Sequence, residues 1–185
     1  MKPLRVVGGS ARGRKLRSVP GNATRPITDR AKESLFNILR PDLQDAAFLD
    51  LFAGTGAVGI EALSQGAGFA RFVDNQRDAI KTIRENLELT RFSDLGEVLQ
   101  ADAFAHVNAP ANKQFDYVFI APPQFHSLWK RALESVDSRP EWLVDDAWVI
   151  VQVDPTEYEK VELKNLKEFD KRKYGNVVLV FYQRA

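Results

Sequence analysis

Apolar positions along this chain follow two spacings, one typical of buried strands and the other of helices with one apolar face. Helical segments separate short runs rich in apolar residues, and Ile80, Ile83 and Leu87 recur on one helical face. The pattern predicts strands at 46–52, 69–74, 97–101, 115–121 and 146–153, and helices at 56–67, 76–89 and 126–136. Such alternation predicts an α/β fold, with a parallel sheet covered by helices on both faces.

The two ends of the chain add further elements. Residues 28–41 predict a helix that starts at Thr28 as N-cap, has Asp29 in its first turn and ends at Pro41. The C-terminal part predicts a weak strand at 165–171 and a stronger one at 176–183. We therefore expect a basic N-terminal extension, residues 1–27, ahead of one domain, residues 28–185.

The composition excludes several classes of site. The 185 residues contain no cysteine and two histidines, so disulfides and cysteine-ligated zinc are excluded and no metal site is expected. No apolar run approaches the roughly 18 residues of a membrane span. The basic N-terminus lacks the apolar segment of a secretory signal. We expect a monomeric cytoplasmic protein without a membrane partner.

Positive charge is concentrated in the first 40 residues. Ten of them are lysine or arginine and two are acidic, a net charge of +8, while the whole chain carries +1 and the remainder therefore −7. This asymmetry favours an arm that binds a polyanion such as nucleic acid, although a solvated tail would have the same composition. The candidate RNA-binding residues are Arg5, Arg12, Arg14, Lys15, Arg17 and Arg25.

A glycine-rich loop joins the first predicted strand to its helix. Gly54, Gly56 and Gly59 have the G-x-G-x-x-G spacing that brings a backbone close to a ligand at a helix N-terminus. Asp50, inside the strand, would repel a pyrophosphate and would suit a cationic ligand such as a methionine α-amino group; a turn or capping acid is the alternative. Asp74 ends the next strand, where an acid can bind ribose hydroxyls.

The strand at 115–121 ends abruptly at Pro122 and Pro123. Neither proline has an N–H to donate to a sheet, and proline also restricts the residue before it, so the carboxyl end of this strand has one rigid shape. In parallel sheets ligands bind at that edge. The two prolines are therefore expected to face a ligand.

These features together resemble Rossmann-like S-adenosylmethionine-dependent methyltransferases. The segments GGSARGRKL, TRPITDRAKESLFNIL and YGNVVLVFY resemble the RsmD-like guanine-N2 methyltransferases of small-subunit ribosomal RNA, over nearly the whole chain. The resemblance implies a seven-stranded, mostly parallel sheet with an antiparallel last strand. Its partner would be ribosomal RNA or a small-subunit particle. It implies a cofactor site of Thr28, Asp50, Phe52, Gly54, Thr55, Gly56, Asp74, Asn75, Asp102 and Ala103.

The same resemblance implies a catalytic segment after the fourth strand, where this chain departs from the family. The family has an acid, two prolines and an aromatic; this chain has Ala121, Pro122, Pro123 and Gln124, then Phe125. In the family, the acid and the neighbouring carbonyl would each accept a hydrogen bond from an exocyclic amine. Losing the hydrogen bond to the acid would cost about 1.5–3 kcal/mol of stabilisation of the reacting amine. Phe125 would replace the stacking aromatic or be a core residue. His126 would accept a proton or begin the next helix.

Three other functions stay open. A catalytically silent RNA-binding or ribosome-assembly protein would explain Ala121 and Gln124. A DNA amine methyltransferase would use the same chemistry. A nicotinamide-dependent oxidoreductase has only the glycine spacing in its favour, and Asp50 argues against it.

Overall fold

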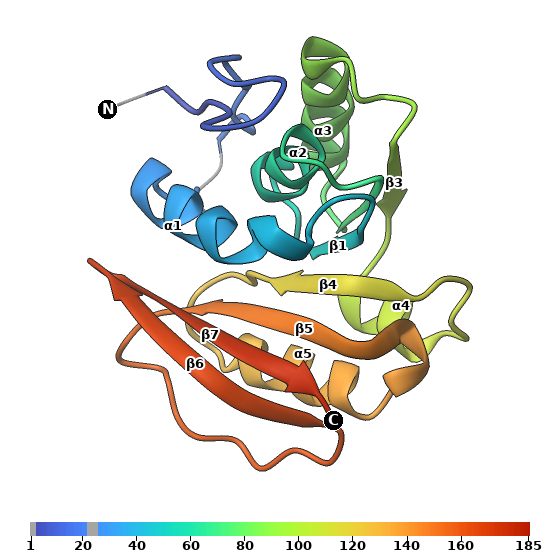
Figure 1. The fold of residues 1–185 in the computed structure, drawn as a ribbon, viewed down its shortest axis with the longest axis vertical. Helices are drawn as coiled ribbons and strands as arrows, with labels where there is room; N and C mark the ends of the chain where they lie inside the picture. The colour runs from blue at the N-terminus through green and yellow to red at the C-terminus, as the bar shows by residue number, and fades with distance from the viewer. Residues whose placement is uncertain (1–2, 22–25) are drawn as a thin grey trace.

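A seven-stranded sheet in the order β3-β2-β1-β4-β5-β7-β6 is the centre of the fold (Figure 1). The computed structural model describes residues 3–21 and 26–185. The strands are β1 (Ala47–Leu51), β2 (Phe69–Asp74), β3 (Gly96–Gln100), β4 (Phe115–Ile120), β5 (Leu143–Val153), β6 (Leu166–Tyr174) and β7 (Val177–Arg184). The pairings from β3 through β5 are parallel, and β7 is antiparallel to both neighbours. The Rossmann-like sheet expected from the sequence is confirmed.

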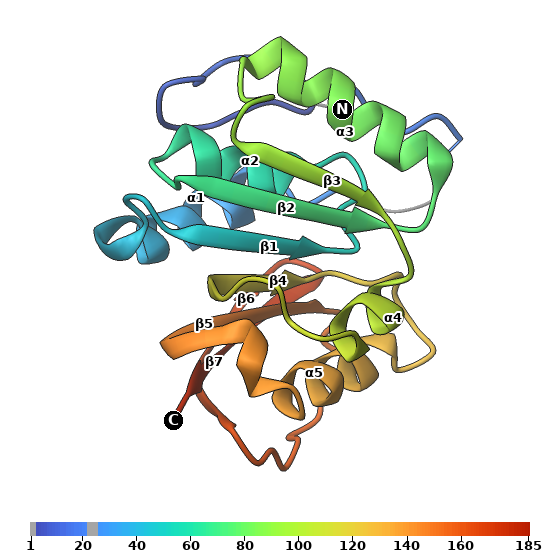
Figure 2. The same ribbon diagram turned by 90° about the vertical axis from the view of Figure 1, so that its right-hand side faces the viewer.

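Helices cover both faces of this sheet, which is why its central strands are buried almost throughout (Figure 2). Residues of α1, α2 and α3 form one core with the sheet, and residues of α4 and α5 form the other. The helices are α1 (Asp29–Leu39), α2 (Ala57–Ser64), α3 (Arg77–Thr90), α4 (Ala103–Asn108) and α5 (Leu128–Asp137), with short 3-10 turns at Arg40–Asp42 and Pro140–Trp142.

The parallel strands β1 to β5 place their carboxyl ends on one edge of the sheet. The strand order reverses between β1 and β4, where Leu51 pairs with Ile120. A crevice opens outside the sheet at such a reversal because the connections on either side lead to opposite faces. The glycine loop follows β1 and the two prolines follow β4, so both lie at this crevice.

The structure differs from the sequence expectations mainly at the ends of elements. Helix α4 was not predicted: it is short, and Asp102 starts it by accepting a hydrogen bond from the Ala105 N–H at 2.9 Å. Helix α5 begins two residues later than predicted, because Phe125, His126 and Ser127 have φ of +69°, +72° and +55°. Strand β5 starts three residues earlier than predicted.

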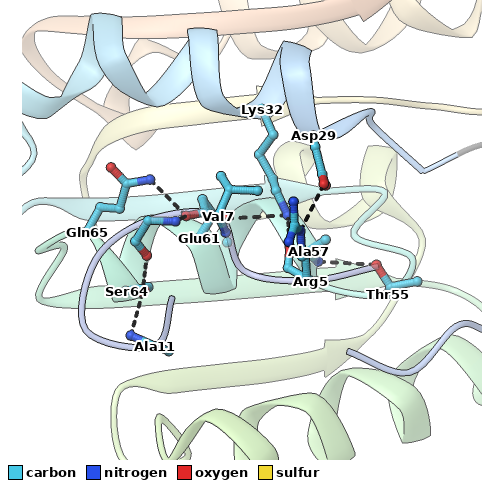
Figure 3. A network of polar contacts seen from close by, with 12 residues as sticks. Arg5, Val7, Ala11, Asp29, Lys32, Thr55, Ala57, Glu61, Ser64 and Gln65 are labelled. Carbon is cyan, nitrogen blue, oxygen red and sulfur yellow. Dashed lines mark hydrogen bonds and ion pairs between the residues drawn. The ribbon is translucent and has the colours of Figure 1, made fainter. Parts of the chain in front are cut away.

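The described N-terminal residues pack against the domain rather than extending from it. Val6, Ala11 and Leu16 are buried in the same core as residues of α1, α2 and α3. The carboxylate of Glu61 on α2 accepts hydrogen bonds from the N–H groups of Val7 and Gly8, each at 2.9 Å (Figure 3). The first 27 residues thus include a segment that shares the core of the domain.

A buried ion pair joins this segment to α1. The ammonium of Lys32 lies 3.4 Å from Glu61 Oε1, with both side chains 0% exposed, and donates to the Arg5 carbonyl at 2.6 Å (Figure 3). Burial lowers the pKa of Lys32 below its ordinary value, although Glu61 acts in the opposite direction. The pair was not expected from the sequence.

We predict that Lys32→Met lowers the free energy of unfolding by about 3–5 kcal/mol, because it leaves the Glu61 charge buried and uncompensated. Chemical denaturation measures it. Lys130→Met, which removes a solvent-exposed partner of Glu159, is the matched control and should leave the free energy of unfolding nearly unchanged. Equal effects of the two substitutions would contradict the importance of the buried pair.

Candidate active site

Two adjoining cavities lie at the carboxyl edge of the sheet, on either side of the end of β4. The first has a volume of about 370 Å³ and the second about 420 Å³. Four residues line both: Phe52, Gly54, Ala121 and Pro123. The glycine loop and the proline turn, far apart in the sequence, therefore form one divided cleft.

The local geometry requires glycine at each of the three positions, and Gly54 itself has φ of +57°. Gly56 is the N-cap of α2 with φ of +79°, a conformation that other residues rarely adopt. A Cβ on Gly59 would lie 2.4 Å from the ring of Phe72, so glycine lets α2 approach β2 closely. Gly56 lines neither cavity; it shapes the loop that presents Gly54 and Thr55.

Asp50 is a buried acid at the floor of the first cavity. It is 2% exposed, and its carboxylate accepts a hydrogen bond from the Gly59 N–H at 3.1 Å. Burial raises the pKa of Asp50 well above its usual range; the Gly59 N–H opposes this shift and the nearby Asp74 adds to it. A cation in the cavity would stabilise the ionised form, so Asp50 suits a positively charged ligand.

Three acids line the second cavity: Asp74, Asp78 and Asp102. Asp74 accepts hydrogen bonds from the N–H groups of Gly54 and Gln76, each at 2.9 Å. Its carboxylate thereby fixes the glycine loop, and each oxygen keeps a lone pair for a hydroxyl group. Asp102 caps α4 through one oxygen and lines the same cavity as Asn75 and Ala103.

The proline turn leads into a strained segment at the mouth of the first cavity. Phe125 has φ of +69° and is 56% exposed, and its N–H donates to Glu157 at 2.7 Å. Of the two alternatives for Phe125, a core residue is the one that the structure contradicts, because Phe125 lies on the rim of the cavity with Gln124. Strain of this kind is often concentrated at ligand sites. His126 is exposed and lines neither cavity.

Thr28 does not line either cavity. Its hydroxyl accepts a hydrogen bond from the Ala31 N–H at 3.2 Å and caps α1, as the sequence indicated. Its neighbours Pro26 and Ile27 line the first cavity instead. Arg25 lies outside the described residues.

The other candidate RNA-binding residues are exposed on the N-terminal segment. Arg5 pairs with Asp29 at 3.1 Å and Arg17 with Glu85 at 3.6 Å. Arg14 donates to the Leu89 carbonyl at 3.3 Å, and Lys15 forms a β-bridge with Arg5. Arg12 lines a surface hollow of about 730 Å³ with Arg40.

Sequence reasoning missed a buried amide that joins this basic segment to the glycine loop. Asn86 on α3 is 0% exposed. Its side-chain N–H groups donate to the carbonyls of Arg17 at 3.0 Å and Thr55 at 2.9 Å, and its oxygen accepts from the Arg17 N–H at 2.7 Å. A polar residue three positions after Ile83, on the apolar face of the helix, was the available signal.

A second contact missed by sequence reasoning lies in the second cavity. The guanidinium of Arg131 stands 3.8 Å from the centre of the Phe104 ring, and both residues line this cavity. Phe104 also packs edge to face with Phe52, at 5.8 Å between ring centres. These residues form an aromatic wall between the glycine loop and α4.

Neither a metal site nor a membrane span is found within residues 3–21 and 26–185. No group of three or more His, Cys, Asp or Glu in these ranges could hold a metal ion. None of the helices there is long and apolar enough to cross a membrane.

A family model described as "Conserved hypothetical protein 95" matches residues 4–183. The chain belongs to this family. It is 34% identical to YlbH of Bacillus subtilis, over 98% of this chain and 99% of that protein. It is also 34% identical to "Ribosomal RNA small subunit methyltransferase D" of Escherichia coli, over 80% of this chain and 74% of the relative. The solved structure of Escherichia coli YhhF superposes with a TM-score of 0.87 and 32% identity, covering 99% and 98% of the two chains.

These matches confirm the resemblance to RsmD-like proteins and agree with the fold read from the sequence. The family match covers both the N-terminal segment and β7. The N-terminal segment, which packs into the core of this chain, therefore lies within the region that the family model matches.

From the buried carboxylate we predict that affinity for S-adenosylmethionine, the cofactor implied by the sequence resemblance, rises as the pH increases while the ligand's α-amino group stays charged. The raised pKa of Asp50 keeps it protonated at low pH; its ionised form attracts the cation, and the α-amino group of the ligand stays charged below about pH 7.7. Calorimetric titration across this range measures the effect.

Asp50→Asn should flatten that pH dependence, because the amide does not ionise. Asp94→Asn, at an exposed acid in the turn after α3, is the control and should keep the parent's dependence. The same rise in the parent and in Asp50→Asn would exclude Asp50 as its source.

Proposed function

We propose that this chain is an S-adenosylmethionine-dependent methyltransferase of ribosomal RNA, and that it methylates the exocyclic N2 amine of a guanine in the small-subunit RNA. The observation that carries the proposal is the divided cleft, whose two cavities share Phe52, Gly54, Ala121 and Pro123. A transferring methyl group must sit where the cofactor and target sites meet. The name of the Escherichia coli relative supports the substrate class.

The residues in the cleft fit the proposed cofactor. Asp50 and Gly54 would receive the charged methionine end, and Asp74 the ribose hydroxyls. Asp102 would accept from the adenine amino group, beside the wall formed by Phe104 and Arg131. Thr55 and Asn75 line the two cavities at the sides of this path. The cofactor, when bound, supplies a methyl group on a positively charged sulfur.

The proline turn would position the target base. Because proline fixes its own φ and restricts the preceding residue, the Pro122 carbonyl has a fixed direction at the cavity. That carbonyl would accept one N–H of the amine. Phe125, exposed on the rim, would stack on a base turned out of its helix.

The basic N-terminal segment would bind the RNA backbone close to this cleft. Val19, Pro20 and Gly21 line the second cavity, and Pro26 and Ile27 line the first, so the segment that carries the basic residues runs to the mouth of both. Lysine and arginine bind RNA phosphates through charge, without reading sequence. This explains why the positive charge lies at this end of the chain.

The test of this function is methyl transfer from labelled cofactor to small-subunit RNA and to small-subunit particles, with duplex DNA as a comparison. We predict transfer to the RNA substrate, with N2-methylguanine as the product. Phe125→Ala should weaken target binding by about 1–3 kcal/mol through the lost stack. Phe169→Ala, at an exposed phenylalanine of β6 outside both cavities, should not.

Three results would oppose the proposal. Transfer to DNA alone would identify the DNA methyltransferase instead. Binding of cofactor and RNA without any transfer would favour the catalytically silent protein. A methylated base other than N2-methylguanine would be consistent with an RNA methyltransferase but would reject guanine N2 as the target atom.

We predict that replacing Arg12 and Lys15 together by glutamine weakens RNA binding at low salt and flattens its dependence on salt concentration. Each lost phosphate contact should reduce the slope of log affinity against log salt by about one. Substitution is a cleaner test than deletion, because deletion would uncover the core around Val6 and Leu16. Filter binding at several salt concentrations measures the slope.

Lys160 and Lys167, exposed near and on β6, provide the matched control. Replacing both by glutamine removes the same charge from a different part of the surface. An equal reduction of the salt slope in this control pair would show that the net charge of the protein, and not the N-terminal segment, accounts for the salt dependence of RNA binding.

A further inference from the structure

Gln152 on β5 lies beside the residue where the sequence lacks an acid. Phe119 pairs with Ile150 and Ile120 with Val151, so the next level of the two parallel strands contains Ala121 and Gln152. Side chains two residues apart on a strand project from the same face. Ala121 and Gln152 therefore share the face of Phe119 and of its partner on β1, Asp50.

The surroundings of Gln152 do not explain why it is polar. Its carboxamide oxygen is shielded from solvent and accepts no hydrogen bond from the residues that the structure describes. Two residues earlier on the same face stands Ile150, and the partner of Gln152 on β7 is Leu179; both are 0% exposed. Gln152 as a whole is half-buried, and a shielded acceptor that lacks a donor is costly.

Gln152 lines the first cavity together with Ala121, Pro122 and Asp50. Neighbouring strands lie about 4.7–4.9 Å apart, which is within the reach of a glutamine side chain. The methyl group of Ala121 leaves open the space that a carboxylate at this position would fill. Rotation about the last torsion of glutamine, which is soft, turns the oxygen into that space.

We propose that the Gln152 carboxamide oxygen accepts a hydrogen bond from the exocyclic amine of the target base, in place of the carboxylate that is absent at position 121; this inference rests on the proposed function. The Pro122 carbonyl accepts the second N–H, so the nitrogen lone pair points toward the cofactor. The lone pair forms the new N–C bond as the C–S bond breaks, and the electron pair of that bond stays on sulfur. The proton released by the methylated nitrogen goes to water.

The variant that tests this is Gln152→Leu, compared with Gln152→Glu and with Gln183→Leu, a glutamine on β7 outside both cavities. Single-turnover methyl transfer to small-subunit RNA or particles is measured at saturating cofactor and RNA. We expect Gln152→Leu to lower the rate by about tenfold to a hundredfold, the effect of one lost hydrogen bond to the reacting group. Gln152→Glu, which keeps an acceptor, and Gln183→Leu should each stay within about threefold of the parent.

Stability separates this role from a structural one. Leucine removes an acceptor that has no donor among the described residues, so Gln152→Leu should melt at the same temperature as the parent or higher. Its dissociation constants for cofactor and RNA should be unchanged. Ala121→Asp added to Gln152→Leu should restore most of the rate, because the carboxylate would occupy the same space.

The outcomes are distinct. No transfer by the parent rejects the proposed function and the inference with it. Transfer by the parent with an undiminished rate in Gln152→Leu overturns the inference alone. An equal loss of rate in Gln152→Leu and Gln152→Glu also overturns the inference, because it would indicate a packing role. The inference is likewise overturned if the double variant of Ala121→Asp and Gln152→Leu folds and binds both ligands but stays as slow as Gln152→Leu.

Discussion

The carboxylate of Glu61 is the interaction on which the arrangement of the N-terminal half depends. It accepts hydrogen bonds from the Val7 and Gly8 N–H groups and from Gln65, and pairs with the ammonium of Lys32. One buried charge thereby joins the N-terminal segment, α1 and α2. Because the segment runs on to line both cavities, the placement of residues at the mouth of the cleft depends on a contact remote from it.

The cleft separates its acids by environment. Asp50 is buried with a raised pKa, so it is suited to neutralising a cation. Asp74 is held by two backbone N–H groups, and Asp102 caps α4 at the surface; these two are suited to accepting from neutral hydroxyl and amino groups. In the proposed cofactor site, the same residue type would therefore serve different ends of one ligand, with burial deciding which end each acid serves.

Rigid backbone fixes the shape of the proposed target side of the cleft, although position 121 is an alanine. The two prolines hold the end of β4 in place, and Phe125, His126 and Ser127 have positive φ, which brings Phe125 to the rim. Alanine at position 121 therefore removes a functional side chain from the cleft, while the backbone of the turn keeps its shape. The adjacent strand supplies a polar side chain at the same level, and only the register of β4 against β5 brings the two residues together.

The sequence by itself determined the alternating strands and helices, the glycine loop and the proline turn, because these follow from local periodicity and backbone restriction. Ends of elements were missed where tertiary contacts outweighed local preference, as at the short helix α4 and the delayed start of α5. Only the tertiary structure decided that the basic segment shares the core, that Phe125 is exposed, and that Lys32 meets Glu61. It also decided that Gln152 stands beside Ala121. These are pairings between distant residues, and hydrophobic periodicity identifies the face that is buried but not which polar groups meet there.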